Sequence, residues 1–189
     1  HLSIRRQRQM CIRDRRLAGP ALDAGPIKPL ARTPDAYIYE NLNALPRALV
    51  APEARQADFA AMLETGSWPQ GFDPRRAVLL AKVPPRPGCA PLSQASVPPA
   101  AVIVAYQNTA VTIDVASPGC GYLVLNDAWQ RWWTVSVNGE PGAVLRANVL
   151  FRAVAIPAGR STVTFRFEPF KGLGRDCLLY TSPSPRDRG

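Results

Sequence analysis

The stretch that decides the fold is AVTIDVAS, residues 110–117. Within it Val111, Ile113 and Val115 alternate with polar or small residues. Successive side chains of a strand point to opposite faces, so an apolar period of two predicts a strand with one buried and one solvated face.

Runs of the same kind occupy the chain from residue 100 to residue 169, with turn residues such as NGEPG and PAGR between them. The neighbouring runs are AAVIVAYQN (100–108), GYLVLNDA (121–128), WWTVSVNG (132–139), GAVLRAN (142–148), LFRAVAIPAG (150–159) and STVTFRFEP (161–169). Seven or more short strands separated by turns are typical of an antiparallel β-sandwich. We therefore predict a mainly β, jelly-roll-like sandwich whose edge strands are protected by proline or charge.

The first half of the chain is less regular. Residues 16–35 are rich in Pro, Gly and Ala and have no sustained period, so we expect a linker that leads into a sandwich domain over residues 36–170. RALVA, residues 47–51, predicts a strand that ends at Pro52. QADFAAMLETG predicts one short helix, with Gly66 just past its end.

The two ends of the chain differ from everything between them. RRQRQMCIRDR, residues 5–15, and CLLYTSPSPRD, residues 177–187, resemble translations of the two adapters that transposase-based sequencing kits attach to DNA fragments. We expect residues 1–15 and 177–189 to be adapter-derived, disordered tails on a metagenomic fragment, because such segments do not belong to the fold. Residues 171–176 would then begin a truncated continuation of the native chain.

Most of the net positive charge of the chain lies in these two tails. The formal net charge is +9, but the tails hold seven arginines and two aspartates. Five of the nine excess positive charges therefore lie in the tails, and the other basic residues form no run. This distribution does not favour a nucleic-acid partner.

Histidine and cysteine limit the chemistry further. The single histidine is His1, so the expected native segment has no Ser-His-Asp, Cys-His or imidazole-metal site. Its two cysteines, Cys89 and Cys120, lack the C-x-x-C spacing of a zinc site. They form either one disulfide or two free thiols, and we expect no metal and no cofactor.

Two separated motifs resemble a known family. YIYENLNALPRALVA, residues 37–51, is similar to the signature vYeN-x-x-a-LPRA of the YfhO-like bacterial membrane proteins. NDAWQRWWTVSVNGEPGAVLRANVLFRAVAIPAG, residues 126–159, is similar to the C-terminal signature of that family. The matching positions are Asp127, Trp133, Val137, Gly139, Ala147, Asn148, Arg152, Val154, Pro157 and Gly159. Arg131 and Trp132 replace the usual Pro-Gly, and Asn138 replaces an Asp in a turn pair that tolerates positive φ.

The resemblance implies a parent protein in the bacterial cytoplasmic membrane, with many transmembrane helices. That parent would be similar to glycosyltransferases that use lipid-linked sugars and glycosylate polymers of the cell envelope. The chain would be its non-catalytic C-terminal domain on the extracytoplasmic side. Its partners would be its own transmembrane domain and, in one hypothesis, an envelope glycan or lipid-linked sugar.

The alternative is a carbohydrate-binding β-sandwich of a secreted or periplasmic protein. For either hypothesis Trp129, Arg131 and Trp132 are the candidate sugar platform, since aromatic faces contact the C–H groups of a sugar. Trp133 is expected in the core, because adjacent strand residues face opposite sides.

We expect structural roles for the remaining motif residues. Asp127 is expected to cap the turn before the tryptophans by accepting backbone N–H bonds. For Asn148 and Arg152 we favour a hydrogen-bonded turn with a surface arginine over a ligand-binding site. Tyr39 and Asn41 read as a strand end followed by an Asx-turn. No pair of carboxylates is spaced for glycoside hydrolysis.

Overall fold

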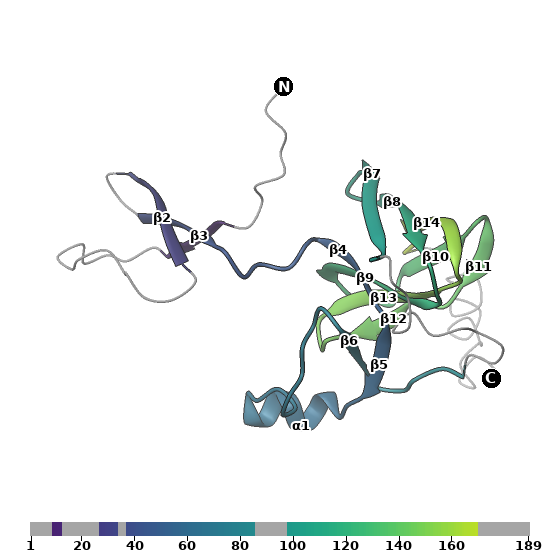
Figure 1. Cartoon of the computed structure of the whole chain (residues 1–189), viewed down its shortest axis with the longest axis horizontal. Helices are drawn as coiled ribbons and strands as arrows, with labels where there is room; N and C mark the ends of the chain where they lie inside the picture. The colour runs from purple at the N-terminus through teal and green to yellow at the C-terminus, as the bar shows by residue number, and fades with distance from the viewer. Residues whose placement is uncertain (1–8, 13–26, 34–36, 86–97, 170–189) are drawn as a thin grey trace, which may run out of the picture. The chain divides into compact units, whose positions relative to one another are not determined.

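The mainly β fold with one short helix is confirmed (Figure 1). The residues that the computed structural model describes are 9–12, 27–33, 37–85 and 98–169. The chain divides into two units, His1–Pro46 and Arg47–Gly189.

The first unit is a three-stranded antiparallel sheet with the order β1-β3-β2. Its strands are β1 Gln9–Ile12, β2 Ile27–Arg32 and β3 Tyr37–Asn41. Two expectations differ from this arrangement. The expected linker contains β2, and four residues of the expected N-terminal tail pair with β3 as β1.

The sequence hides β2 because this strand has no buried face. In IKPLAR only Ile27 is partly buried, so the strand carries no apolar period. Pro29 is tolerated because β2 is an edge strand, and the pairing shifts register between Pro29 and Ala31. The predicted domain start at residue 36 also differs from the observed division after Pro46.

The motif residues of β3 have the predicted structural roles. Tyr39 is buried in the strand, and Asn41 ends it. The Asn41 side-chain oxygen accepts a hydrogen bond from the Asn43 N–H at 3.0 Å, which forms the expected Asx-turn.

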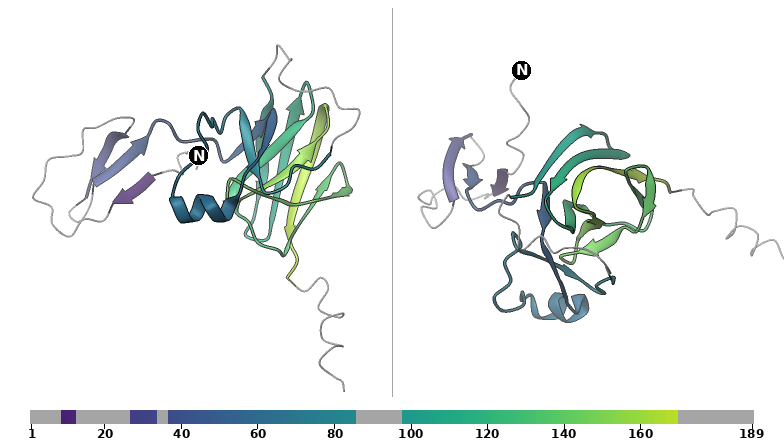
Figure 2. Two further views of the ribbon diagram at one scale, coloured as in Figure 1. Left: turned by 90° about the horizontal axis from the view of Figure 1, so that it is seen from below. Right: turned by 45° about the vertical axis from the view of Figure 1, so that its right-hand side comes forward.

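The second unit is the predicted sandwich, in which the strands of two sheets gather around a common interior (Figure 2). The five-stranded sheet has the order β11-β10-β14-β8-β7, and the six-stranded sheet has the order β4-β9-β13-β12-β6-β5. The five-stranded sheet contains β7 Ala100–Tyr106, β8 Ala110–Ser117, β10 Trp133–Val137, β11 Glu140–Gly142 and β14 Gly159–Phe167. The six-stranded sheet contains β4 Ala48–Ala51, β5 Glu53–Gln56, β6 Ala77–Leu80, β9 Gly121–Ala128, β12 Leu145–Ala147 and β13 Phe151–Ile156.

The chain crosses between the sheets in the connections β6–β7, β8–β9, β9–β10, β11–β12 and β13–β14. Each crossing places the apolar face of a strand against the interior. In β8 the three alternating residues Val111, Ile113 and Val115 are all buried. The main core between the sheets consists of Ala48, Val50, Val111, Ile113, Val115, Leu123, Leu125, Val135, Val154, Ile156, Val163 and Phe165.

The predicted helix is α1 Phe59–Thr65, which lies beside β5 and β6 (Figure 1). Asp58 caps its N-terminus by accepting bonds from the N–H groups of Ala60 and Ala61. Gly66 ends it in the left-handed conformation, as the sequence predicts. Phe59 anchors the helix in a small core with Leu79 and Val149.

Three of the four edge strands of the second unit, β5, β7 and β11, are protected in two different ways. β5 and β11 carry charge or proline, as predicted. The edge strand β7 has neither, and its Val102 and Val104 are 47% and 54% exposed. Its pairing with β8 instead shifts register between Ile103 and Ala105, which makes a β-bulge. For β7, therefore, protection by proline or charge was the wrong expectation.

Cys120 stands at the turn between β8 and β9 and is buried. It is disulfide-bonded, so the free-thiol alternative is wrong for this residue. Cys89 lies outside the described residues.

Candidate functional site

One polar cluster joins the two sheets inside the sandwich. It consists of Arg47, Tyr106, Asp127, Trp133 and Arg152, and we call it the Asp127 cluster. Its members come from both sheets and are far apart in sequence.

Arg152 is the buried member. On β13 it alternates with Val154 and Ile156, so the strand period turns its side chain toward the core between the sheets. It is only 2% exposed. The predicted surface position of Arg152 is therefore wrong.

The contacts of Arg152 run to both sheets. Its Nη2 donates to Asp127 Oδ2 at 3.2 Å, and its Cζ lies 3.6 Å from the centroid of the Trp133 ring. Nε and Nη1 have no hydrogen-bond partner among the described residues. Burial lowers the pKa of the Arg152 guanidinium, and the charge of Asp127 opposes that shift.

Arg47 and Tyr106 complete the cluster at its exposed side. Arg47 Nε donates to Asp127 Oδ1 at 2.8 Å, and Arg47 is about one-third exposed. Its Cζ lies 4.0 Å from the centroid of the Tyr106 ring, and its Nη2 donates to the Tyr106 hydroxyl. That hydroxyl also lies 3.4 Å from Asp127 Oδ2.

Asp127 accepts bonds from side chains and does not cap the turn before the tryptophans. This expectation was wrong because Asp127 shares the inward face of β9 with Leu123 and Leu125, where two guanidinium groups reach it. Two guanidinium cations and one carboxylate sum to a charge of +1, and these two ion pairs lie within the six-stranded sheet. Tyr106 and Trp133 extend the cluster to the five-stranded sheet. Glycoside hydrolysis instead needs two opposed carboxylates, one of them protonated.

Asp114, a carboxylate on β8 of the five-stranded sheet, is not part of this cluster. It is exposed on β8 and accepts a bond from the Thr162 hydroxyl at 2.9 Å. Within the described ranges no three His, Cys, Asp or Glu side chains are grouped as metal ligands. The Asp127 cluster thus consists of two ion pairs, hydrogen bonds and ring contacts.

Asn138 and Asn148 play the same role in two turns. Asn138 has φ 54°, and Gly139 after it has φ 87°, as the predicted turn pair requires. Asn138 N–H donates to Thr162 O at 2.9 Å, and its side-chain oxygen accepts from Thr162 N–H at 2.9 Å. Asn148, with φ 47°, makes both bonds with Leu79 at the same 2.9 Å, and its side-chain bond is buried.

The turn at Asn148 confirms half of the sequence interpretation. A hydrogen-bonded turn was expected, and one is present between β12 and β13. Asn148 and Arg152 do not share one continuous strand, so the spacing of four residues does not place them on a common face. Asn148 instead ties β6 to the turn between β12 and β13, and Arg152 ties β13 to Asp127 of β9.

The predicted sugar platform is only partly assembled. Arg131 is exposed, and its Cζ lies 4.2 Å from the centroid of the Trp132 ring, so a guanidinium covers one face of that ring. Trp132 lies in a turn, because β10 begins at Trp133. The Cζ of Arg146 lies 5.8 Å from the centroid of the Trp129 ring. In the described part of the chain Trp129 has no ring contact with Trp132.

Trp133 is partly buried and lies against the core, on the inward side that the sequence predicts. It packs against the main core and contacts the Phe167 ring at 5.3 Å between centroids. Its position explains why Trp132 and Trp133 do not act as one aromatic surface.

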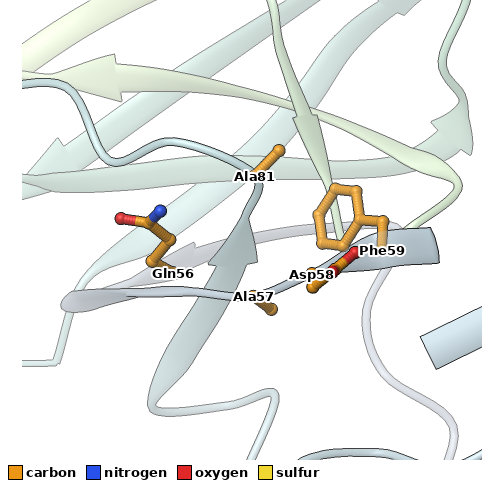
Figure 3. Close-up of a pocket in the computed structure, with 5 residues that line it drawn as sticks. All are labelled: Gln56, Ala57, Asp58, Phe59 and Ala81. Atoms are coloured by element: carbon orange, nitrogen blue, oxygen red, sulfur yellow. The ribbon is translucent and has the colours of Figure 1, made fainter. Parts of the chain in front are cut away.

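A pocket of about 360 Å³ lies beside the start of α1 (Figure 3). It is lined by Gln56, Ala57, Asp58, Phe59 and Ala81. Gln56 extends to the side away from the Phe59 ring, and Asp58 is already occupied as the helix cap. This lining offers no converging polar groups that would orient a ligand.

Sequence reasoning missed Arg47 and Tyr106 as members of the cluster. Arg47 stands within the LPRA motif, but nothing in the motif indicates its partner across 80 residues. The burial of Arg152 did carry a signal, since its position follows the apolar period of FRAVAI. That signal was available at residues 151–156 and outweighs the general preference of arginine for the surface.

In the comparisons with known proteins, no family model, curated protein or solved structure matches the chain. Across the described residues, no helix combines the length and apolar character needed to cross a bilayer.

Proposed function

We propose that the chain is the non-catalytic extracytoplasmic domain of a polytopic bacterial membrane protein similar to the YfhO-like family. In this role it supports the glycosylation of a cell-envelope polymer, and another part of the parent protein performs the transfer. The domain contributes a rigid sandwich and a surface for the acceptor polymer.

One observation carries the proposal. The two motifs of the resemblance, which are separated by 74 residues between Ala51 and Asn126, meet at the Asp127 cluster. Arg47 of the first motif and Arg152 of the second bind the two oxygens of Asp127. Arg47 of one motif and Asp127 and Arg152 of the other thus share one physical task, and chance similarity of two unrelated stretches gives no reason for such a meeting.

The chemistry of the cluster favours a supporting role. Both side-chain oxygens of Asp127 are bound by arginine side chains, and the other motif residues Asn138 and Asn148 serve turns. The motif residues therefore account for the stability of the sandwich and leave the transfer step to groups elsewhere.

The test is to read the gene on both sides of the fragment. Outward-facing primers within the codons for residues 47–169, applied to the source DNA, recover the flanking sequence. We expect several upstream spans of about 20 apolar residues. A parent gene with no such span would overturn the proposal and favour the secreted alternative.

The second candidate is the carbohydrate-binding sandwich of a secreted or periplasmic protein. Its support is the sandwich fold together with exposed aromatic residues. It predicts sugar binding by the chain and a parent gene that encodes no membrane-spanning helix.

A further inference from the structure

We propose that Trp68 is a binding platform for one sugar ring of a polysaccharide. The platform consists of Trp68 stacked on Phe72, and we call the pair the Trp68 platform. The ring centroids are 5.4 Å apart and the planes differ by 7°. One face of the indole is thus supported from behind.

The loop that carries the platform is fixed at several points. Phe72 N–H donates to Pro69 O at 3.1 Å, and Gly71 between them has φ +67°. This is the backbone of a tight turn that needs glycine at its third position. The turn brings residues 68 and 72 side by side, so the stacking follows from the backbone.

Both ends of the loop are also held. On one side Gly66 N–H donates to Met62 O at the helix end. On the other side Asp73 accepts the N–H of Arg75 at 2.9 Å through its side chain. Phe72 itself packs against the small core of Phe59, Leu79 and Val149, which anchors the platform to the sandwich.

Exposure separates Trp68 from the other tryptophans. It is 56% exposed, whereas Trp129, Trp132 and Trp133 are all only partly exposed. No cation or second ring covers its free face in the part of the chain that the structure describes, in contrast to Trp132 under Arg131. A rigid, half-exposed indole of this kind has a large apolar area available for a partner.

The chemistry of that free face fits a pyranose. One side of a pyranose presents polarised C–H groups, which the negative face of an indole attracts, while its hydroxyls project from the rim. Exposed polar residues flank Trp68 on both sides, Ser67 and Gln70, and supply donors and acceptors for that rim.

A lipid surface is the competing partner, and charge argues against it. From Asp58 to Lys82 the chain has three acidic and three basic residues, so this region carries no net positive charge. Attraction to anionic lipids requires a local excess of Lys and Arg. The sugar is therefore the partner that the surroundings favour.

The choice of an envelope polymer as the source of the sugar rests on the proposed function, but the platform itself does not. Binding of soluble sugars is measured on the chain alone, whereas the proposed function is tested on the flanking gene. The two can therefore fail separately.

The experiment uses the full 189-residue chain and linear oligosaccharides of glucose, galactose and N-acetylglucosamine, with binding followed by calorimetry. We expect at least one series to bind, and Trp68→Ala to weaken that binding by about tenfold or more. Trp68→Phe keeps the stack and should retain part of the affinity. Leu63→Ala, which shortens another exposed apolar side chain, should leave it unchanged.

Urea unfolding of each variant shows whether the sandwich is intact. Absence of binding by the original chain to every oligosaccharide overturns the proposal, as does equal binding by Trp68→Ala. A parallel arm uses vesicles of phosphatidylglycerol and phosphatidylethanolamine. Vesicle binding that depends on Trp68, without sugar binding, would identify a membrane contact instead.

Discussion

The guanidinium carbon of Arg152 lies 3.6 Å from the centre of the Trp133 ring, and this contact links β13 of one sheet to β10 of the other. A cation over an indole face is attracted by the ring, and more strongly when both are removed from water. The same guanidinium donates to Asp127, so one side chain joins three strands. The stability of the sandwich should therefore be sensitive to this arginine's counter-ion.

Asp127→Ala is expected to lower the free energy of unfolding by about 3–5 kcal/mol, because it leaves the buried Arg152 without its carboxylate. Urea unfolding followed by tryptophan fluorescence measures the loss. Asp114→Ala is the matched control, since it removes a strand carboxylate with an exposed hydrogen bond. It should cost less than about 1.5 kcal/mol, and equal losses in both variants would contradict the role of Asp127.

Adding Arg152→Met to Asp127→Ala should recover part of the lost stability. Breaking a buried ion pair is costly, whereas replacing both members by apolar groups is often close to neutral, within about 1–4 kcal/mol of the original. The double variant is compared with Asp127→Ala by the same urea measurement. A double variant less stable than the single one would show that Arg152 stabilises mainly through its contacts with the Trp133 and Phe165 rings.

Asn148→Ala should destabilise the chain more than Asn138→Ala does. Both residues have positive φ and both make the same pair of 2.9 Å bonds, but only the side-chain bond of Asn148 is buried. Loss of that acceptor leaves the Leu79 N–H unpaired, which costs about 1–3 kcal/mol. Asn148→Gly relieves the backbone strain and should recover about 1 kcal/mol of this loss. Equal effects at the two turns would contradict the argument from burial.

Deletion of residues 1–15 should leave the unfolding of the sandwich unchanged. The only described strand in that segment, β1, pairs with β3 inside the first unit. All four tryptophans lie in the second unit, so their fluorescence reports on the sandwich alone. A shift of the urea midpoint by more than the experimental error would show that the segment contributes to the sandwich.

The sequence was sufficient for those parts of the fold that have a period. The alternation of Val111, Ile113 and Val115 predicted β8. The segment from Asp58 to Gly66 includes both the N-cap and the C-cap residue of α1. β2 was not predicted, because a strand that is exposed along almost its whole length has no buried face and therefore no apolar period. Local pattern predicts an element only when burial imposes one.

The candidate site was less predictable for a different reason. Asp127 and Arg152 are both motif residues, yet Arg47, the second arginine that binds Asp127, is 80 residues from it. Period and spacing describe neighbours along a strand and carry no information on which strands meet. Trp68 was missed because it stands in a loop, where its stacking on Phe72 depends on one glycine turn and not on any repeated pattern.

The bulge in β7 has a consequence for the behaviour of the protein in concentrated solution. AAVIVAY has high β-propensity and no charge, and a flat edge of this composition would be a template for fibril growth. The register shift after Ile103 breaks the regular spacing of the outermost backbone groups. An incoming chain then finds no uninterrupted ladder of backbone groups to pair with, so the bulge disfavours edge-to-edge association at β7.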